Sequence, residues 1–337
     1  MEVTLQVSGL GQVRGGIEAH ASELLNLLQR HGHEVRVVDS LSTNYWRSHE
    51  GDDVLVCEGI HRLNLLKLKI HGRSRFRIRI LFTHGSFFET IHLLKLTTEG
   101  YRPNPALIGA KLLFDRLVMR SLLAQFDAIF TLSDAETLDL VNQWPEFASR
   151  LHALEQPLTA QEVAHSKQSN LQWSDLKPFV LTVCRVEPRK NLTSAVAALA
   201  SSGLNYIVVG QDHGGLSPLR KFVRRHEVKN FHYFGVVSDD DRTHLMRDCS
   251  VFLLPSFLEG VPFSVLEALQ AGAPVVCTEN SYLRPMKRVF ACRPDPGSIA
   301  RSVAQAAALG RETDPPSAQT LNSPDALWQS LSPYFNP

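Results

Sequence analysis

The sequence has few cysteines and no long hydrophobic run. Its five cysteines are scattered and form no C-x-x-C pair, which argues against a disulfide framework or a zinc knuckle and favours a reducing cytoplasm. No stretch approaches the ~20 apolar residues that a membrane-spanning helix needs. The first residues alternate like a strand rather than forming a signal peptide. We therefore expect a cytoplasmic protein whose only membrane contact would be peripheral.

An excess of charge of either sign is also absent. Lys and Arg number 35 and Asp and Glu 34, which gives a net charge of +1. Because a dedicated nucleic-acid binder normally carries a basic excess, we expect no nucleic-acid partner. The length of 337 residues, 44% of them hydrophobic, favours two ordinary cores over one.

Short apolar strands alternate with amphipathic helices in both halves of the chain. A strand at 3–7, a Gly-rich loop at 8–16 and a helix at 17–30 open the first half, and a second strand–helix series begins at Phe179. This pattern predicts an α/β fold in which two doubly wound parallel sheets face one another across a cleft at the carboxyl ends of their strands.

A polar stretch between residues 159 and 177 separates the two series, and we interpret it as a domain linker. We place an N-terminal Rossmann-like domain at 1–165 and a C-terminal domain at 175–312. The last segment, 313–337, is expected to pack back toward the N-terminal domain.

The most informative segment follows an apolar strand at 251–254. Glu259 lies in a loop, Pro262 lies near the first helical turn, and Glu267 follows about one and a half turns into the helix. The backbone amides of Val261, Phe263 and Ser264 at this helix N-terminus suit a phosphate. The carboxylates of Glu259 and Glu267, on either side of this phosphate position, could bind the hydroxyl groups of a sugar and of a ribose.

Two cations follow the first strand of the second series. Arg185 and Lys190 lie just past the carboxyl end of that strand, where a guanidinium and an ammonium could neutralise a diphosphate. A solvated surface loop would also explain them.

Arg185, Lys190-Asn191 and Glu259-x7-Glu267, in this order, resemble the motif of the retaining glycosyltransferases of family 4, which have the GT-B fold. The resemblance covers nearly the whole chain. Gly15-Gly16 resembles the family's N-terminal glycine loop, Thr83-His84-Gly85 its active-site histidine, and residues 234–238 its segment beside the nucleotide base.

The resemblance implies that Arg185 and Lys190 bind the donor diphosphate, that Glu259 holds the donor sugar and Glu267 the ribose, and that His84 contacts the sugar or the leaving phosphate. We take His84, Arg185, Lys190 and Glu259 as the catalytic candidates. The donor-binding candidates are Gly15, Gly16, Val236, Gly260, Val261, Pro262, Phe263, Ser264 and Glu267. The implied partners are a nucleotide-sugar donor and a glycan or lipid-linked acceptor.

The histidines show no metal-ligand spacing, so we expect no metal and no cofactor, with the nucleotide-diphosphate sugar as substrate. A metal-independent transfer with retention at the anomeric carbon is the predicted reaction. A homologue that binds sugar nucleotides without turnover is an alternative.

A second alternative comes from the Gly-rich loop itself. Gly9, Gly11 and Gly15, with Asp39 ending the second strand, mimic a dinucleotide fingerprint, which would suit an NAD-type oxidoreductase. That interpretation does not account for Arg185, Lys190 or the glutamate pair.

One further segment is strongly basic. Residues 62–79 contain seven Lys and Arg and no acidic residue, and from Lys67 onward the cations alternate with apolar residues. Such a face could contact anionic lipid headgroups, or it could be a solvated strand edge whose charges prevent aggregation.

Overall fold

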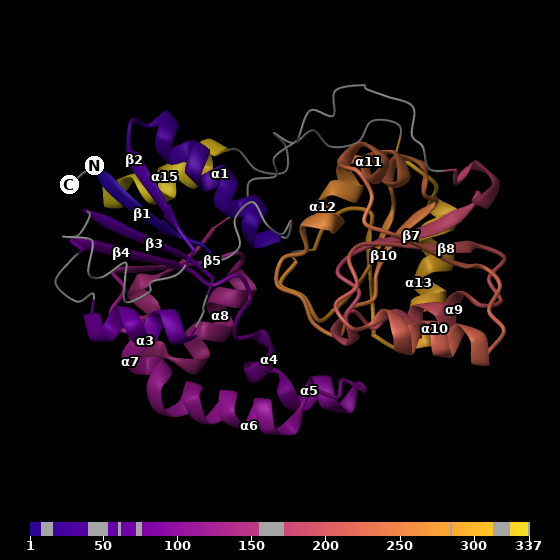
Figure 1. The fold of residues 1–337 in the computed structure, drawn as a ribbon, viewed down its shortest axis with the longest axis horizontal. Coiled ribbons are helices and arrows are strands. Elements are labelled where there is room, and N and C mark those ends of the chain that lie inside the picture. The colour runs from indigo at the N-terminus through magenta and orange to yellow at the C-terminus, as the bar shows by residue number, and fades with distance from the viewer. Residues whose placement is uncertain are drawn as a thin grey trace.

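The chain forms two α/β units, each built on one parallel sheet (Figure 1). The computed structural model describes residues 1–7, 16–39, 53–59, 62–71, 76–154, 172–283, 285–312 and 324–335. The predicted fold class is confirmed. In the described residues, no helix is long and apolar enough to cross a membrane.

The first unit has six strands in the order β2-β1-β3-β4-β5-β6. The strands are β1 Glu2–Gln6, β2 Glu34–Val38, β3 Val54–Glu58, β4 Ile78–Phe82, β5 Ala128–Thr131 and β6 Leu151–Ala153. The helices are α1 Gly16–Arg30, α3 Arg62–His71, α4 Phe88–Ile91, α5 Leu93–Thr98, α6 Pro105–Phe114, the π-helical η1 Asp115–Met119, α7 Arg120–Leu123, α8 Asp134–Gln143 and the 3-10 turn η2 Pro145–Arg150.

The second unit also has six strands, in the order β12-β11-β10-β7-β8-β9. They are β7 Phe179–Val183, β8 Asn205–Val209, β9 Phe231–Gly235, β10 Val251–Leu254, β11 Val275–Thr278 and β12 Val289–Cys292. The helical segments are η3 Ser174–Leu176, η4 Pro188–Lys190, α9 Leu192–Leu199, α10 Leu216–Arg225, α11 Asp239–Asp248, α12 Phe263–Gln270 and α13 Pro296–Leu309.

Each strand of a doubly wound sheet contributes side chains to two cores, because successive residues point to opposite faces. In β7, Val180 belongs to the core on one face of the second sheet, whereas Phe179 and Leu181 belong to the core on the other. Helices cover both faces (Figure 1), which explains why these strands are continuously apolar.

The last helix, α15 Pro324–Phe335, returns to the first unit. Its Leu327, Leu331 and Phe335 are buried in the same core as Val3 of β1 and Leu24 of α1. Figure 1 shows α15 beside α1 on one face of the first sheet. The final turns of the chain thus complete the core of the unit in which the chain begins.

The strand-like interpretation of the basic segment was wrong. Residues 62–71 form helix α3, and the strand that follows in the described part of this segment begins at Ile78. The alternation from Lys67 to Ile70 resembles a strand, but the apolar pair that becomes buried is Leu65 and Leu68, three residues apart as on one helical face. Packing of this pair against the first core overrides the local alternation.

Helix starts in the first unit have clear local causes. The Asn104 side chain accepts hydrogen bonds from the amides of Ala106 and Leu107, and Pro105 is the first residue of α6. Ser133 similarly caps α8 by accepting from the amide of Glu136. Both are preferred N-cap residues because a short side-chain oxygen satisfies an otherwise unpaired helical amide.

Candidate functional site

The two units touch where the turn after β4 meets the loop before α12. A Cβ atom added to Gly85 would lie 2.6 Å from the Gly260 Cα, and one added to Gly260 would lie 2.9 Å from the His84 carbonyl oxygen. Gly85 also has a positive φ of 71°, which favours glycine. The backbone of His84 is in the left-handed region as well, with a φ of 50°. Glycine at both positions therefore allows this close approach.

Polar contacts extend the junction between the units. Asp139 of α8 accepts from the Tyr282 hydroxyl of the second unit at 2.9 Å and contacts His92 at 2.6 Å. The Asn280 side-chain amide donates to Glu99 at the end of α5. Both units thus contribute hydrogen-bonding groups to the junction.

A buried ion pair lies on the second-unit side of this junction. The Lys190 Nζ donates to Glu259 Oε1 at 2.5 Å, and the two side chains are only 10% and 9% exposed. The Ser256 hydroxyl donates to the same carboxylate oxygen at 2.5 Å. Burial alone would raise the pKa of Glu259, but Lys190 and Arg189 outweigh it and lower that pKa. Glu259 therefore carries a negative charge that its neighbours hold in place.

The loop conformation that positions Lys190 depends on the next residue. Asn191 has a left-handed φ of 52° and is buried. Its side-chain amide donates to the carbonyls of Pro255 and Pro294 at 3.0 and 2.8 Å. Asparagine tolerates this backbone region better than most residues, so Asn191 joins η4 to the loop that carries Glu259.

The neighbouring arginines differ in environment. Arg185 follows the end of β7 and is exposed. Arg189, which the sequence analysis did not select, contacts Glu187 at 2.7 Å and Glu259 at 3.8 Å. Its position next to Lys190 was the signal available in the sequence, but nothing there distinguished it from a solvated cation.

The loop from Gly260 to Ser264 leads from Glu259 into α12. Phe263 is the first helical residue and Pro262 is its N-cap, so Phe263 and Ser264 lie in the first turn as predicted. Val261 and Pro262 are partly or fully buried, and Val261 packs near Leu266.

Glu267 lies further along α12 and contacts Arg242 of α11 at 3.0 Å. Burial raises the pKa of Glu267, an effect that Arg242 partly opposes. Val236, which was predicted to lie beside the base, is 74% exposed at the end of β9. Gly15 lies outside the described residues, and Gly16 is the first residue of α1.

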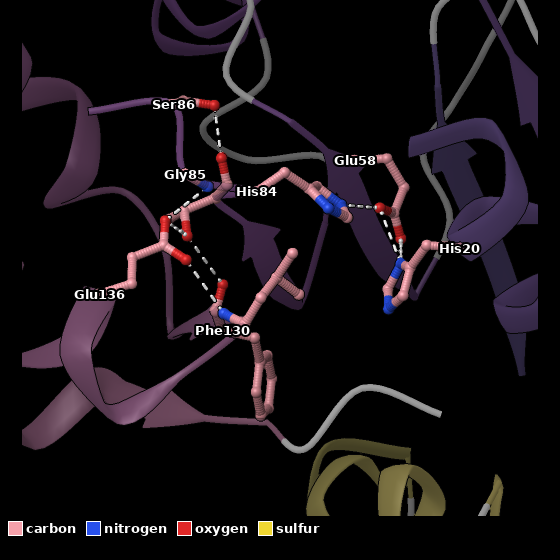
Figure 2. Close-up of polar contacts among 9 residues, drawn as sticks. His20, Glu58, His84, Gly85, Ser86, Phe130 and Glu136 are labelled. Carbon is pink, nitrogen blue, oxygen red and sulfur yellow. Dashed lines mark hydrogen bonds and ion pairs between the residues drawn. The ribbon is translucent and has the colours of Figure 1, made fainter. Parts of the chain in front are cut away.

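On the first-unit side, His84 belongs to a buried cluster with two residues that the sequence analysis missed (Figure 2). Glu58 ends β3, and its carboxylate contacts His84 Nε2 at 2.5 Å and His20 Nδ1 at 3.1 Å. The side chains of all three residues are at most 3% exposed. The strand-end position of Glu58 could have indicated it, since carboxyl ends of parallel strands gather at one edge.

The charges of this cluster follow from its contacts. Burial alone would raise the pKa of Glu58, but His20 and His84 together lower it to about 2. Burial lowers the pKa of His20, and Glu58 more than reverses this effect, so the pKa of His20 lies above its usual value. We infer an ionised Glu58 that accepts a hydrogen bond from each ring.

The same three residues offer ligand atoms within 4.8 Å of one another and so could hold a metal ion. Metal-bound histidines usually donate their second ring nitrogen to a partner. His20 Nε2 is buried without a hydrogen-bond partner in the described part of the chain. The chemistry of the cluster therefore fits a hydrogen-bonded carboxylate better than a metal centre.

A second buried carboxylate shapes the turn that carries His84. Glu136 accepts from the Thr83 hydroxyl at 2.5 Å, from the Gly85 amide at 2.7 Å and from the Leu132 amide at 3.0 Å (Figure 2). Burial raises the pKa of Glu136, and these donors oppose the shift. These hydrogen bonds, all within the first unit, hold the turn at residues 83–85 that lies against Gly260.

Comparisons with known proteins add independent information. Residues 165–288 match the family model described as "Glycosyl transferases group 1". An N,N'-diacetylbacillosaminyl-diphospho-undecaprenol alpha-1,3-N-acetylgalactosaminyltransferase of Campylobacter jejuni is 31% identical over 121 residues, which are 34% of this chain and 31% of that protein. O-antigen chain mannosyltransferase B of Escherichia coli is 30% identical over 112 residues, 31% of this chain and 29% of that protein. The match therefore spans about a third of these relatives.

Solved structures resemble the whole chain. Sucrose-phosphate synthase from Thermosynechococcus elongatus has a TM-score of 0.73 at 16% identity, with 99% of this chain and 97% of that chain covered. Anabaena HepE, solved in complex with UDP and glucose, has a TM-score of 0.69 at 16% identity, with 99% and 100% covered. At this identity the likeness establishes the GT-B fold.

Proposed function

We propose that this chain, whose residues 165–288 match the family model of the glycosyl transferases group 1, transfers a sugar from a nucleotide-diphosphate sugar to an acceptor hydroxyl. The observation that carries the proposal is the buried Lys190–Glu259 pair beside the first turn of α12. It combines a cation for phosphate with a fixed carboxylate for hydroxyl groups. The family match favours this reaction over an NAD-type oxidoreductase, because it covers the residues that the dinucleotide pattern leaves unexplained.

In this proposal the second unit binds the donor. Lys190 and the exposed Arg185 neutralise the diphosphate, together with the amides of Phe263 and Ser264 in the first turn of α12. Glu259 accepts hydrogen bonds from the donor sugar, and Glu267 from the ribose. The segment at Val236 lies beside the base.

Donor binding changes the partners of Lys190. In the structure the Lys190 ammonium donates to Glu259 Oε1, and the Ser256 hydroxyl donates to the same oxygen. A diphosphate competes with Glu259 for the Lys190 ammonium. Hydroxyl groups of the donor sugar then take the place of the ammonium as donors to the Glu259 carboxylate. The Ser256 bond and Arg189 continue to hold Glu259 during this exchange, so the site does not leave a buried charge without a partner.

Transfer then proceeds with retention and without a metal. The bond between the anomeric carbon and the diphosphate oxygen breaks as the acceptor hydroxyl attacks from the same face. The hydroxyl proton passes to the departing phosphate oxygen. Lys190, Arg185 and the helix amides stabilise the charge that develops on the diphosphate. His84 approaches the same region from the first unit through its backbone contact with Gly260.

The acceptor is proposed to be a glycan, in particular a lipid-linked one. The Campylobacter relative acts, by its name, on a diphospho-undecaprenol-linked sugar, and the Escherichia coli relative builds an O-antigen chain. An acceptor of this kind would be met at the surface of a membrane by the first unit.

The test starts with donor binding and then measures chemistry. Thermal-shift titration with UDP, GDP and ADP in the presence of EDTA should identify one base that raises the Tm. Donor hydrolysis with the matching sugar nucleotides should follow, with NMR of the product anomer to establish retention. Binding without hydrolysis or transfer would identify the non-catalytic homologue.

Two variants make this test specific. Lys190→Met should weaken the thermal shift and slow turnover by about 10²–10³, whereas Lys287→Met should behave like the wild type, because Lys287 is 87% exposed and pairs with Glu312. Equal behaviour of the two variants would refute the assignment of the donor site to Lys190.

A further inference from the structure

The carboxylate of Glu58 is shared by two imidazole rings (Figure 2). Its Oε2 atom lies 2.5 Å from His84 Nε2 and 3.1 Å from His20 Nδ1, and its Oε1 atom lies 3.2 Å from the same nitrogen of His20. Among the described residues, no lysine or arginine pairs with this buried carboxylate. The charge of Glu58 therefore depends on the two histidines.

This arrangement determines which nitrogen of His84 carries a proton. Glu58 is ionised, because the two histidines lower its pKa to about 2. An ionised carboxylate only accepts hydrogen bonds, so each ring must present an N–H group to it. His84 is therefore protonated at Nε2, the nitrogen beside Glu58. Because the bond made by one ring nitrogen sets the role of the other, His84 Nδ1 is the nitrogen that remains for a different partner.

Packing also holds the ring of His84. The His20 ring meets it edge to face, with ring centroids 5.0 Å apart and an interplanar angle of 78°. Phe82 lies 5.0 Å from the His20 ring and stacks on Phe130 at 5.4 Å. The His84 side chain is only 3% exposed. Rotation of this ring would break both its contact with Glu58 and its packing, so the ring has one favoured orientation.

His20 carries a cost that packing alone does not explain. Its Nε2 atom is buried without a hydrogen-bond partner in the described part of the chain, and an unpaired buried polar atom destabilises a fold. The next buried residues of α1, Ala21 and Leu24, are apolar. An apolar side chain at position 20 would avoid the cost. What the imidazole adds there is the hydrogen bond from Nδ1 to Glu58.

We propose that Glu58 and His20 are positioning residues for His84. Glu58 fixes the His84 ring with its Nε2–H group toward the carboxylate, and His20 fixes the carboxylate. His84 Nδ1 is then the ring nitrogen that binds the sugar nucleotide, where the turn of residues 83–85 meets Gly260. The role of His84 in this inference rests on the proposed function, whereas the arrangement of the three side chains does not.

The elements that carry the three residues suit such a role. His20 lies on α1, Glu58 ends β3, and His84 follows β4. A reacting group is held most precisely when packing and hydrogen bonds from rigid helices and strands lock its side chain. The turn that carries His84 would otherwise leave the orientation of its ring to the loop alone.

The first experiment observes the ring nitrogens directly and needs no substrate. Long-range proton–nitrogen NMR spectra of protein labelled with ¹⁵N-histidine, recorded with EDTA, show which ring nitrogen is protonated, and His84→Gln identifies the signals of His84. In the wild type, Nε2 of His84 should carry the proton. In Glu58→Gln one amide oxygen serves two rings, so His84 should show a mixture of both tautomers. A wild-type proton on Nδ1 alone, or His84 signals unchanged by Glu58→Gln, would overturn the proposal.

Glu136→Gln is the matched control for these spectra. Glu136 is a second buried carboxylate at the same turn, but it accepts from the Gly85 amide and the Thr83 hydroxyl rather than from the ring. Its replacement should lower the Tm and leave Nε2 of His84 protonated. The same tautomer mixture in Glu136→Gln would show that loss of any buried carboxylate disturbs the ring, which contradicts a specific role for Glu58.

The second experiment is a double-mutant cycle on donor turnover. Glu58→Gln and His84→Gln should each lower kcat by about 10–10²-fold, the range for a misplaced reacting group. The double variant should be no slower than His84→Gln, because Glu58 acts only through that ring. His20→Asn retains a donor near the position of Nδ1 and should keep most of the turnover, whereas His20→Leu should resemble Glu58→Gln.

The two experiments separate the two hypotheses. Losses in kcat that multiply in the double variant would show that Glu58 acts independently of His84 and would overturn the proposal. Equal turnover of His20→Asn and His20→Leu would remove His20 from it. A wild-type protein with Nε2 of His84 protonated and no turnover of any sugar nucleotide contradicts only the proposed function.

Discussion

Replacing Lys190 by methionine would leave Glu259 buried without its main counter-charge. The pair is joined at 2.5 Å, and both side chains are at most 10% exposed. Removing one partner of such a pair costs about 3–5 kcal/mol, because the remaining charge loses compensation that water cannot restore. Arg189 at 3.8 Å retains part of that compensation, which favours the lower end of the range.

The corresponding thermal effect is measurable. A loss of about 3 kcal/mol should lower the Tm by about 10 °C in a domain of this size. The assay is differential scanning fluorimetry of the wild type, Lys190→Met, Glu259→Gln and the double variant. Because the double variant removes both charges, it should recover most of the stability lost in Lys190→Met.

Turnover should not recover in the same way. The proposed reaction uses Lys190 on the diphosphate, so the single and double variants should both be slower by about 10²–10³. A Lys190→Met protein with wild-type Tm and turnover would refute both the buried pair and its role. Recovery of turnover in the double variant would show that the pair is structural only.

Three further predictions concern the junction, the histidine cluster and metals. Gly260→Ala should lower turnover by about tenfold or more with an unchanged Tm, since its Cβ would lie 2.9 Å from the His84 carbonyl oxygen. Gly109→Ala is the control, because a Cβ at Gly109 meets open space. Equal turnover in the two variants would contradict the contact between the units. The stability from the cluster should be complete between pH 4.5 and 6.5. It is lost as pH rises through the raised pKa of His20, and as pH falls toward the Glu58 pKa of about 2. Glu58→Gln should therefore flatten the fall in Tm above pH 6.5, and an unchanged slope would contradict the assigned charges. Dialysis against EDTA should leave turnover by the purified protein unchanged, and restoration of lost activity by zinc alone would contradict the proposed metal-independent mechanism.

Much of the fold followed from local patterns. Strands buried on both faces produce continuous apolar runs, so β7 and β10 could be located from the sequence within about a residue. Residues 62–71 were misread because their short alternation fits a strand. The contacts of Leu65 and Leu68 with the first core decide between the two structures, and these contacts involve residues distant in the sequence.

The candidate site was only partly predictable for the same reason. Lys190 and Glu259 were each selected, but a separation of 69 residues gave no indication that they form one ion pair. Glu58 and His20 were missed because a glutamate ending a strand and a histidine within a helix are unremarkable by themselves. The parallel pairing of β3 with β4 places the ends of both strands at one edge, which is what brings Glu58 to His84.

Glu89 connects helix α6 of the first unit with the candidate donor site. Burial raises the pKa of Glu89, but Lys111 and Tyr101 outweigh it and the nearby Arg189 also lowers that pKa, so Glu89 is ionised between α6 and the second unit. Arg189 also contacts Glu259. A chain of charges therefore runs from Lys111 of α6 through Glu89 and Arg189 to Glu259 of the candidate donor site.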